Sequence, residues 1–93
     1  MKPLRGQIRK PAGVLVRQLG SESVLLNLDS ESYFGLDEVG TRMWAALEQS
    51  ASLQEAYEAL VDEYDVDPKR LCADLAAFVE GLAQAGLVEV VDA

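Results

Sequence analysis

Histidine is absent from this chain, and cysteine occurs only at Cys72. Without histidine no Ser-His or Cys-His catalytic pair can form, and the helical pattern around Cys72 predicts a buried thiol. One cysteine excludes an intrachain disulfide, and cysteine–histidine metal spacing is missing. The acidic run at 62–67 fails the calcium-loop template, because Asp67 stands where glycine is needed and Ala73 where glutamate is needed. We therefore expect no catalytic residue, no metal and no cofactor, and hence no enzyme.

Basic residues are also scarce: 8 Lys and Arg stand against 16 Asp and Glu, which gives a net charge of −8. Such a surface repels the phosphates of nucleic acids and favours a basic peptide or a basic protein face. No apolar stretch is long enough to span a membrane, and residues 1–5 lead into no signal-peptide core. The sequence predicts a soluble, cytoplasmic protein without nucleic-acid or membrane partners.

The length and the hydrophobic content fit one small globular domain over 1–93. Its 93 residues are 49% hydrophobic, which is enough for a modest core. Residues 1–11 carry half of the basic side chains, and this segment also contains Pro3 and Pro11. We expect this segment to be a mobile or loosely docked arm, extended at 7–9.

Three short strands are expected at 14–19, 24–28 and 32–36, joined by tight turns into an antiparallel meander. Alternation assigns two faces to this sheet. The expected core face carries Val14, Val16, Val24, Leu26, Leu28, Phe34 and Leu36. The expected outer face carries Leu15, Arg17, Leu25, Asn27 and Tyr33.

Three helices are expected after the strands, at about 38–49, from Ser52 to about 64, and at 68–85. Asp37, Ser52 and Asp67 are their predicted N-caps, and Gly86 ends the last helix as a left-handed residue. Trp44 is expected in the core. Residues 88–91 form either a short strand or an extended tail. The fold class is α+β, a three-stranded antiparallel sheet followed by three helices.

The stretch from Ser32 to Trp44 runs from a strand directly into a helix, and two interpretations of its strand remain open. It is either an edge that a peptide from another protein joins, or a plain hairpin strand that leads into a core helix. Gly35 weakens a strand interior unless another backbone comes close. Leu71 and Phe78 add apolar surface to the third helix beyond what one core face requires. Both features are compatible with a bound segment between them, and the residues alone leave the plain hairpin strand open as well.

Three motifs follow one another in a fairly specific order and spacing. The first is Val24-Leu25-Leu26-Asn27-Leu28. The second is Tyr33-Phe34-Gly35-Leu36-Asp37-Glu38-Val39-Gly40 with Met43-Trp44 and Leu47. The third is Tyr64-Asp65-Val66, Asp74 with Phe78, and Leu82 with Ala85-Gly86-Leu87. Over about residues 12–90 the chain resembles the PqqD-like family, the precursor-recognition elements of ribosomal peptide natural-product (RiPP) pathways. It is most similar to the stand-alone members of lasso peptide biosynthesis.

The resemblance implies a winged-helix-like, non-catalytic domain that binds the leader segment of a precursor peptide as a strand beside its third strand. It implies, as further partners, a leader peptidase and an ATP-dependent cyclase, to which the leader is delivered. Carried onto this sequence, the peptide-binding residues on the strand are Glu31, Ser32, Tyr33, Phe34, Gly35 and Leu36. Those on the third helix are Lys69, Arg70, Leu71, Asp74, Ala77 and Phe78.

Two alternatives stay open. A PqqD-like chaperone can serve another peptide-modifying enzyme, such as a radical enzyme, rather than a lasso peptidase. A winged-helix DNA-binding domain is the less favoured alternative, because its recognition helix needs several basic residues along one face. The third helix offers only Lys69 and Arg70, both in its first turn.

Overall fold

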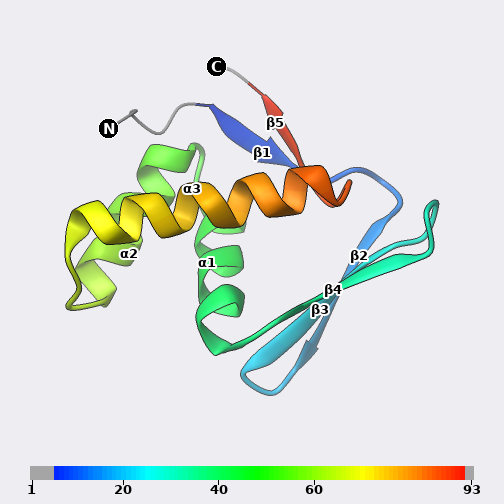
Figure 1. Cartoon of the computed structure of the whole chain (residues 1–93), viewed down its shortest axis with the longest axis horizontal. Coiled ribbons are helices and arrows are strands. Elements are labelled where there is room, and N and C mark those ends of the chain that lie inside the picture. The colour runs from blue at the N-terminus through cyan, green and yellow to red at the C-terminus, as the bar shows by residue number, and fades with distance from the viewer. Residues whose placement is uncertain (1–5, 92–93) are drawn as a thin grey trace.

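The computed structural model of the chain describes residues 6–91. Strands precede helices, as expected for the α+β, winged-helix-like class, and a last short strand follows (Figure 1). The strands are β1 (Gln7–Arg9), β2 (Val14–Leu19), β3 (Glu22–Asn27), β4 (Ser32–Leu36) and β5 (Glu89–Val91). The helices are α1 (Glu38–Gln49), α2 (Leu53–Glu63) and α3 (Pro68–Gln84).

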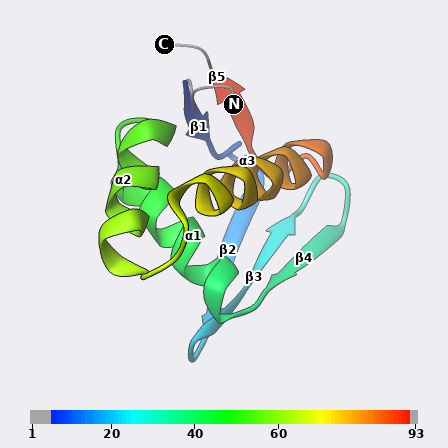
Figure 2. The ribbon, with the colours of Figure 1, turned by 60° about the vertical axis from the view of Figure 1, so that its left-hand side comes forward.

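The central sheet has the order β2-β3-β4 and is antiparallel throughout. The helices lie on one side of it, and β4 continues directly into α1 (Figures 1 and 2). Pairing sets Val16, Leu25 and Phe34 opposite one another in one row across the three strands. Leu25 is completely buried and Phe34 packs against the core, so this row faces the helices.

The predicted assignment of the β3 side chains to the two faces is therefore wrong, because it is shifted by one residue. Leu25 faces the core, whereas Val24 and Leu26 lie on the outer face and Leu28 is 57% exposed beyond the strand. Asn27, expected on the outer face, instead reaches the end of α3. Because side chains alternate with a period of two, a shift of one residue exchanges the two faces of a whole strand.

The expected N-terminal arm is partly a strand. Residues 1–5 lie outside the described part of the chain, but β1 pairs with β5 in a separate two-stranded sheet. Arg9 and Glu89 are opposite each other in this pair and form an ion pair. Ile8 packs against the hydrophobic core. Residues 7–9 are therefore docked, and residues 89–91 form the strand that was one of two expectations.

The helix ends follow the capping signals in the sequence. Asp37 Oδ1 accepts a hydrogen bond from Gly40 N–H at 2.8 Å, and Asp67 Oδ1 accepts one from Lys69 N–H at 3.0 Å. Ser52 Oγ accepts the N–H of Glu55 at 3.2 Å. These side chains satisfy donors that have no partner within the helix, which fixes where each helix begins.

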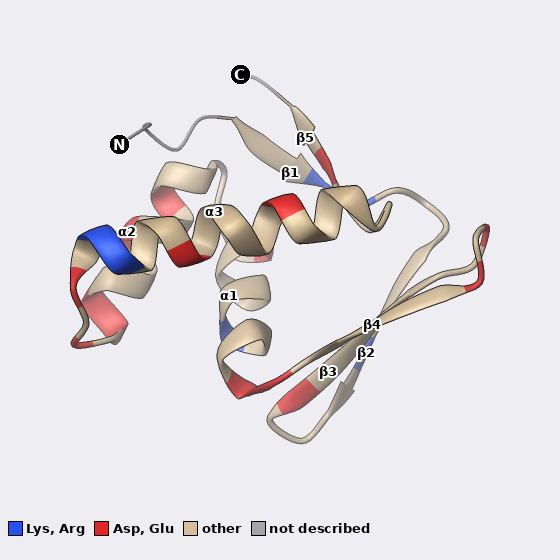
Figure 3. Ribbon diagram, viewed as in Figure 1, with Lys and Arg blue, Asp and Glu red and all other residues tan. Residues whose placement is uncertain are grey.

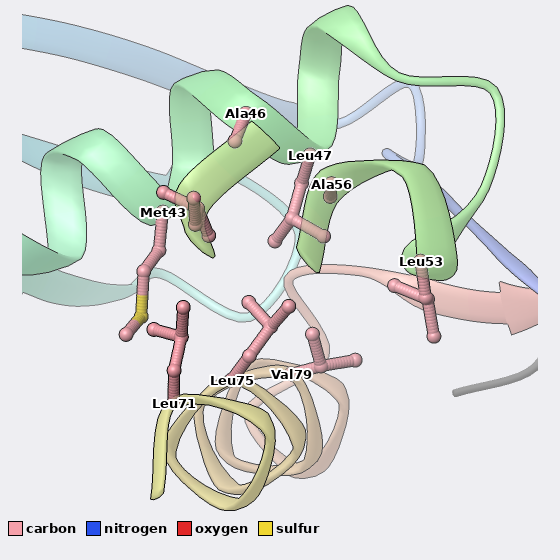
Figure 4. Close-up of a cluster of buried hydrophobic side chains, with 9 residues drawn as sticks. Met43, Ala46, Leu47, Leu53, Ala56, Leu71, Leu75 and Val79 are labelled. Atoms are coloured by element: carbon pink, nitrogen blue, oxygen red, sulfur yellow. The ribbon is translucent and has the colours of Figure 1, made fainter. Parts of the chain in front are cut away.

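The core consists of two clusters of buried side chains, and α3 contributes to both. Leu71, Leu75 and Val79 of α3 point toward α1 and α2 in the first cluster (Figure 4). Leu82 joins the sheet and Trp44 in the second, where Trp44 is 3% exposed, as expected for a core residue. Burying a side chain of this size stabilises the fold by roughly 1.5–3 kcal/mol. The position of α3 is thus set by one buried stripe along its length.

The C-terminal end of α3 is also fixed to the sheet. Gly86 has φ +76, and its N–H donates to the carbonyl of Ala83 while Leu87 N–H donates to that of Leu82. This is the predicted Schellman ending. Asn27 Nδ2 donates to the Gly86 carbonyl at 2.9 Å, which ties the β3–β4 turn to the helix end.

Two glycine-to-alanine substitutions in or after α3 should have opposite effects on stability. Gly86→Ala forces a side chain into a left-handed conformation and brings Cβ within 3.4 Å of Asn27 Nδ2. It should destabilise the protein by about 1 kcal/mol, which lowers Tm by roughly 4–8 °C. Gly81→Ala is the matched control. Its Cβ meets nothing within 4 Å, so helix propensity should raise Tm. Thermal unfolding checks both, and an unchanged Tm for Gly86→Ala would contradict the cap.

Candidate functional site

β4 lies at the edge of the central sheet, so one of its sides is unpaired among the described residues. Which backbone groups face this margin follows from the pairing of β2 with β3. Leu28 N–H donates to the Gly13 carbonyl at 2.9 Å, one step beyond the pair Val14–Asn27. Hydrogen-bonded pairs alternate along antiparallel strands. Even-numbered residues of β3 therefore direct their backbone groups to β2, and odd-numbered residues direct theirs to β4.

The odd-numbered residues of β3 are opposite Ser32, Phe34 and Leu36 of β4. These three residues therefore use their backbone N–H and C=O groups to pair with β3. Tyr33 and Gly35 direct theirs to the open margin. The margin offers two donors and two acceptors in the spacing that an added strand requires.

A hollow of about 560 Å³, which we call the cleft, runs beside this margin. Its walls come from the end of β4, the first turns of α1 and the middle of α3. The lining residues are Phe34, Gly35, Leu36, Asp37, Val39, Gly40, Met43, Asp74, Ala77 and Phe78. The cleft therefore combines unpaired backbone on one wall with small and apolar side chains on the facing helix.

A second hollow of about 510 Å³ continues from the cleft toward the α2–α3 turn. It shares Val39, Met43 and Asp74 with the cleft, so the two form one groove. The other residues that line it are Tyr64, Val66, Asp67, Arg70 and Leu71. Val39 is 50% exposed and Val66 is 48% exposed. Such exposed apolar side chains at the rim of a hollow suit the burial of an apolar ligand group.

The charges around the groove are mainly negative. Asp37 and Asp74 line the cleft, and no Lys or Arg of residues 6–91 does. Arg70 lines the second hollow, and its Nε lies 3.9 Å from Oδ2 of Asp74. Both side chains are largely exposed, so this ion pair is weak. The groove therefore favours a ligand without acidic groups at the level of the cleft.

Tyr64 reaches the second hollow from the end of α2. Burial, and then the charge of Glu63, raise the pKa of the Tyr64 phenol above its usual value. Glu63 forms an ion pair with Arg42 of α1, whose hydrogen bond lowers the pKa of the Glu63 carboxyl. This pair joins α1 to the end of α2 beside the hollow.

The model of the family described as coenzyme PQQ synthesis protein D (PqqD) matches residues 22–88. The chain belongs to the PqqD family. Two solved structures are similar to it, and each holds a peptide. "TbiB1 in Complex with the TbiA(beta) Leader Peptide" is 35% identical with a TM-score of 0.83, and the match covers 91% of this chain and 99% of that one. "Lasso peptide synthetase B1 complexed with the leader peptide" is 25% identical with a TM-score of 0.79, and covers 89% and 98%. No curated protein matches this chain.

Half of the site residues expected from the sequence line the cleft of this PqqD-family chain, and two others line only the second hollow. Those in the cleft are Phe34, Gly35, Leu36, Asp74, Ala77 and Phe78, and those in the second hollow alone are Arg70 and Leu71. Leu71 is only 5% exposed and belongs to the first core cluster. Its role in the fold limits how far it can also serve a ligand.

The other four expected residues lie outside the groove. Glu31 precedes β4, in the turn, with φ +57. Ser32 pairs with β3, and Lys69 lines neither hollow. Tyr33 is 76% exposed on the outer face, away from Phe34, so its side chain does not line a pocket with Phe34 and Phe78. Tyr33 belongs to the margin through its backbone alone.

Sequence reasoning missed much of the α1 side of the groove. The motifs in the sequence contain Val39, Met43 and Val66, but none of the three was expected to line the binding site. The signal available in the sequence was Val39, an apolar residue two positions after the N-cap Asp37. In the structure its side chain is 50% exposed, so Val39 is not a core residue. A tertiary arrangement was needed to bring Val66 to the same hollow.

The described range, residues 6–91, contains no cluster of metal-ligating side chains. No three of the Asp, Glu and Cys side chains in that range are placed to hold a metal ion. Cys72 is buried, as predicted. Within the same range no helix is both long and apolar enough to cross a membrane. On α3 the basic residues are confined to its first turn, and Asp74 and Glu80 follow, so the helix has no basic face (Figure 3).

Proposed function

We propose that this chain is a non-catalytic module that captures the leader segment of a ribosomally made precursor peptide by adding it as a strand to β4. The unpaired margin of β4 beside the groove is the observation that carries the proposal. The two similar structures, each a complex with a leader peptide, support it. No other described segment of the chain competes for that margin.

Strand addition explains how one domain binds an extended peptide. The N–H and C=O groups of Tyr33 and Gly35 pair with the backbone of the leader, which gives affinity that depends little on its sequence. Every second side chain of the leader then points to the same face as Phe34 and enters the cleft. Apolar side chains there contact Phe78 and Ala77 of α3, and these contacts select the sequence.

The leader continues beyond the end of β4, where the chain turns into α1. From that point the second hollow, with Val39 and Val66 at its rim, accepts further apolar side chains of the leader. A leader that is disordered when free loses entropy on binding. Its affinity should accordingly lie between nanomolar and micromolar, roughly −8 to −12 kcal/mol.

Bound in this way, the precursor is held near its processing enzymes at a raised effective concentration. We propose that these enzymes are the leader peptidase and the cyclase of lasso peptide biosynthesis. This assignment is favoured over a chaperone for a radical enzyme because one of the similar structures is a lasso peptide synthetase component. A DNA-binding role is disfavoured, because α3 lacks a basic face and the chain has a net charge of −8.

The Gly35 backbone provides a test of strand addition. Gly35→Pro removes an N–H that faces the open margin, where proline is tolerated in an edge strand. Binding of the leader, measured by calorimetry or fluorescence anisotropy, should weaken more than ten-fold. Gly35→Ala retains the N–H, and its Cβ meets nothing within 4 Å, so it should bind within about three-fold of the native protein. Equal affinities for the two folded variants would exclude pairing at this residue.

The helical wall of the cleft can be tested with adjacent alanines. Ala77 lines the cleft, whereas Ala76 is exposed on α3 outside both hollows. Ala77→Glu places bulk and charge in the path of the leader and should weaken binding more than ten-fold, while Ala76→Glu should leave it nearly unchanged. Both changes are at exposed helix positions, so both proteins should unfold at similar temperatures. If both variants bind the leader with the affinity of the native protein, the leader does not lie in this cleft.

A further inference from the structure

The outer face of the sheet is bare at Gly35. The register places Arg17, Val24 and Gly35 opposite one another in a single row on this face. A Cβ at Gly35 would meet nothing within 4 Å. The missing side chain therefore leaves free space beside Val24 at the edge of the sheet, on the side opposite the cleft.

A shallow depression of about 260 Å³ occupies this space. It lies where β4 ends, beside the β2–β3 turn, and is lined by Leu19, Glu22, Ser23, Val24, Gly35, Leu36 and Asp37. Gly35, Leu36 and Asp37 also line the cleft, so the end of β4 lies between the two hollows. Leu19 is 58% exposed, and Val24 is partly exposed. These two side chains give the depression an apolar wall that nothing covers within the described chain.

An added strand brings one of its side chains to this place. Gly35 directs its backbone to the margin, so in a strand added antiparallel to β4 the residue opposite Gly35 forms a hydrogen-bonded pair with it, with Cα atoms about 5.5 Å apart. Directly opposite residues of paired strands share a face. Since the side of Gly35 that would carry Cβ is the outer one, the side chain of that ligand residue also stands on the outer face. A large side chain there can lie across the bare glycine toward Val24, and Leu19 of β2 forms the far wall of the depression.

We propose that this depression, which we call the outer subsite, is a second specificity site and binds a large apolar or aromatic side chain of the captured peptide. The proposal rests on the strand addition proposed above, and it adds a site on the face away from the groove. Side chains of the peptide are then bound on both faces of β4, in the cleft on one face and in the outer subsite on the other. Packing between cross-strand partners of this kind contributes modestly to affinity but fixes the register of the added strand.

Two leucines provide a matched test. Leu19 is 58% exposed and lines the depression; Leu28 is 57% exposed, stands at the other end of β3, and does not line it. The probe is the leader segment of the precursor peptide from the same pathway, titrated into each folded variant. Leu19→Ala should raise Kd about three- to five-fold, and Leu28→Ala should leave it unchanged. Equal affinities of the two variants would overturn the outer subsite.

An alanine scan of the leader identifies the side chain that occupies the subsite. Replacing one large apolar residue of the leader by alanine should weaken its binding to the native protein. The same replacement should weaken binding to the Leu19→Ala variant much less. If every leader substitution has the same effect in both backgrounds, the subsite is not used. Gly35→Pro separates the two proposals. If it abolishes binding while Leu19→Ala does not weaken it, strand addition stands and the outer subsite falls. If neither variant weakens binding, both proposals fail.

Discussion

The groove beside β4 depends on how α3 packs against the rest of the fold. Its buried stripe packs on α1 and α2 at one end and on the sheet at the other, and Asn27 holds its C-terminal end by a hydrogen bond to the Gly86 carbonyl. With both ends fixed, the face of α3 that carries Asp74 and Ala77 lies across the cleft from the end of β4. The core thus creates the groove, because the contacts that stabilise the fold also hold its two walls apart.

The hydrogen-bonding pattern of the sheet determines which backbone groups of β4 face this groove. A three-stranded sheet necessarily has two edges, and an exposed edge is a template for pairing with another chain. In β4 the alternation leaves Tyr33 and Gly35, rather than Phe34 and Leu36, with free backbone groups. The side chains of Leu36, which is buried, and Phe34, which is half-buried, belong to residues whose backbone is already paired. Within β4, the backbone groups that pair with β3 and those left for the peptide therefore belong to different residues.

Local signals predicted the helices well, because caps and end motifs act within a few residues. Asp37, Ser52, Asp67 and Gly86 each mark a boundary that the structure reproduces within one or two residues. The faces of β3 could not be predicted in the same way. The run from Val24 to Leu28 is apolar at both parities except at Asn27, and that one polar residue points inward to cap a helix end. Leu71 was ambiguous for a related reason, since a residue at the border of two helix stripes can serve the core or the groove.

The second hollow lay beyond sequence reasoning because it brings together the start of α1 and the α2–α3 turn, which are distant in the chain. The docking of residues 7–9 on β5 is likewise a contact between the two ends of the sequence. Such contacts arise from the packing of whole elements and have no local signature. The resemblance to the PqqD-like family supplied the kind of ligand, and the structure supplied the backbone groups that would hold it.

Amide hydrogen exchange, resolved by residue along β4 with and without the leader peptide, tests the central claim most directly. In the free protein the amides of Phe34 and Leu36 should be protected, because they pair with β3, while those of Tyr33 and Gly35 should exchange rapidly. Saturation with the leader should protect Tyr33 and Gly35 and change the other two little. Protection of Tyr33 and Gly35 in the free protein, or rapid exchange of both when the leader is bound, would contradict capture by strand addition.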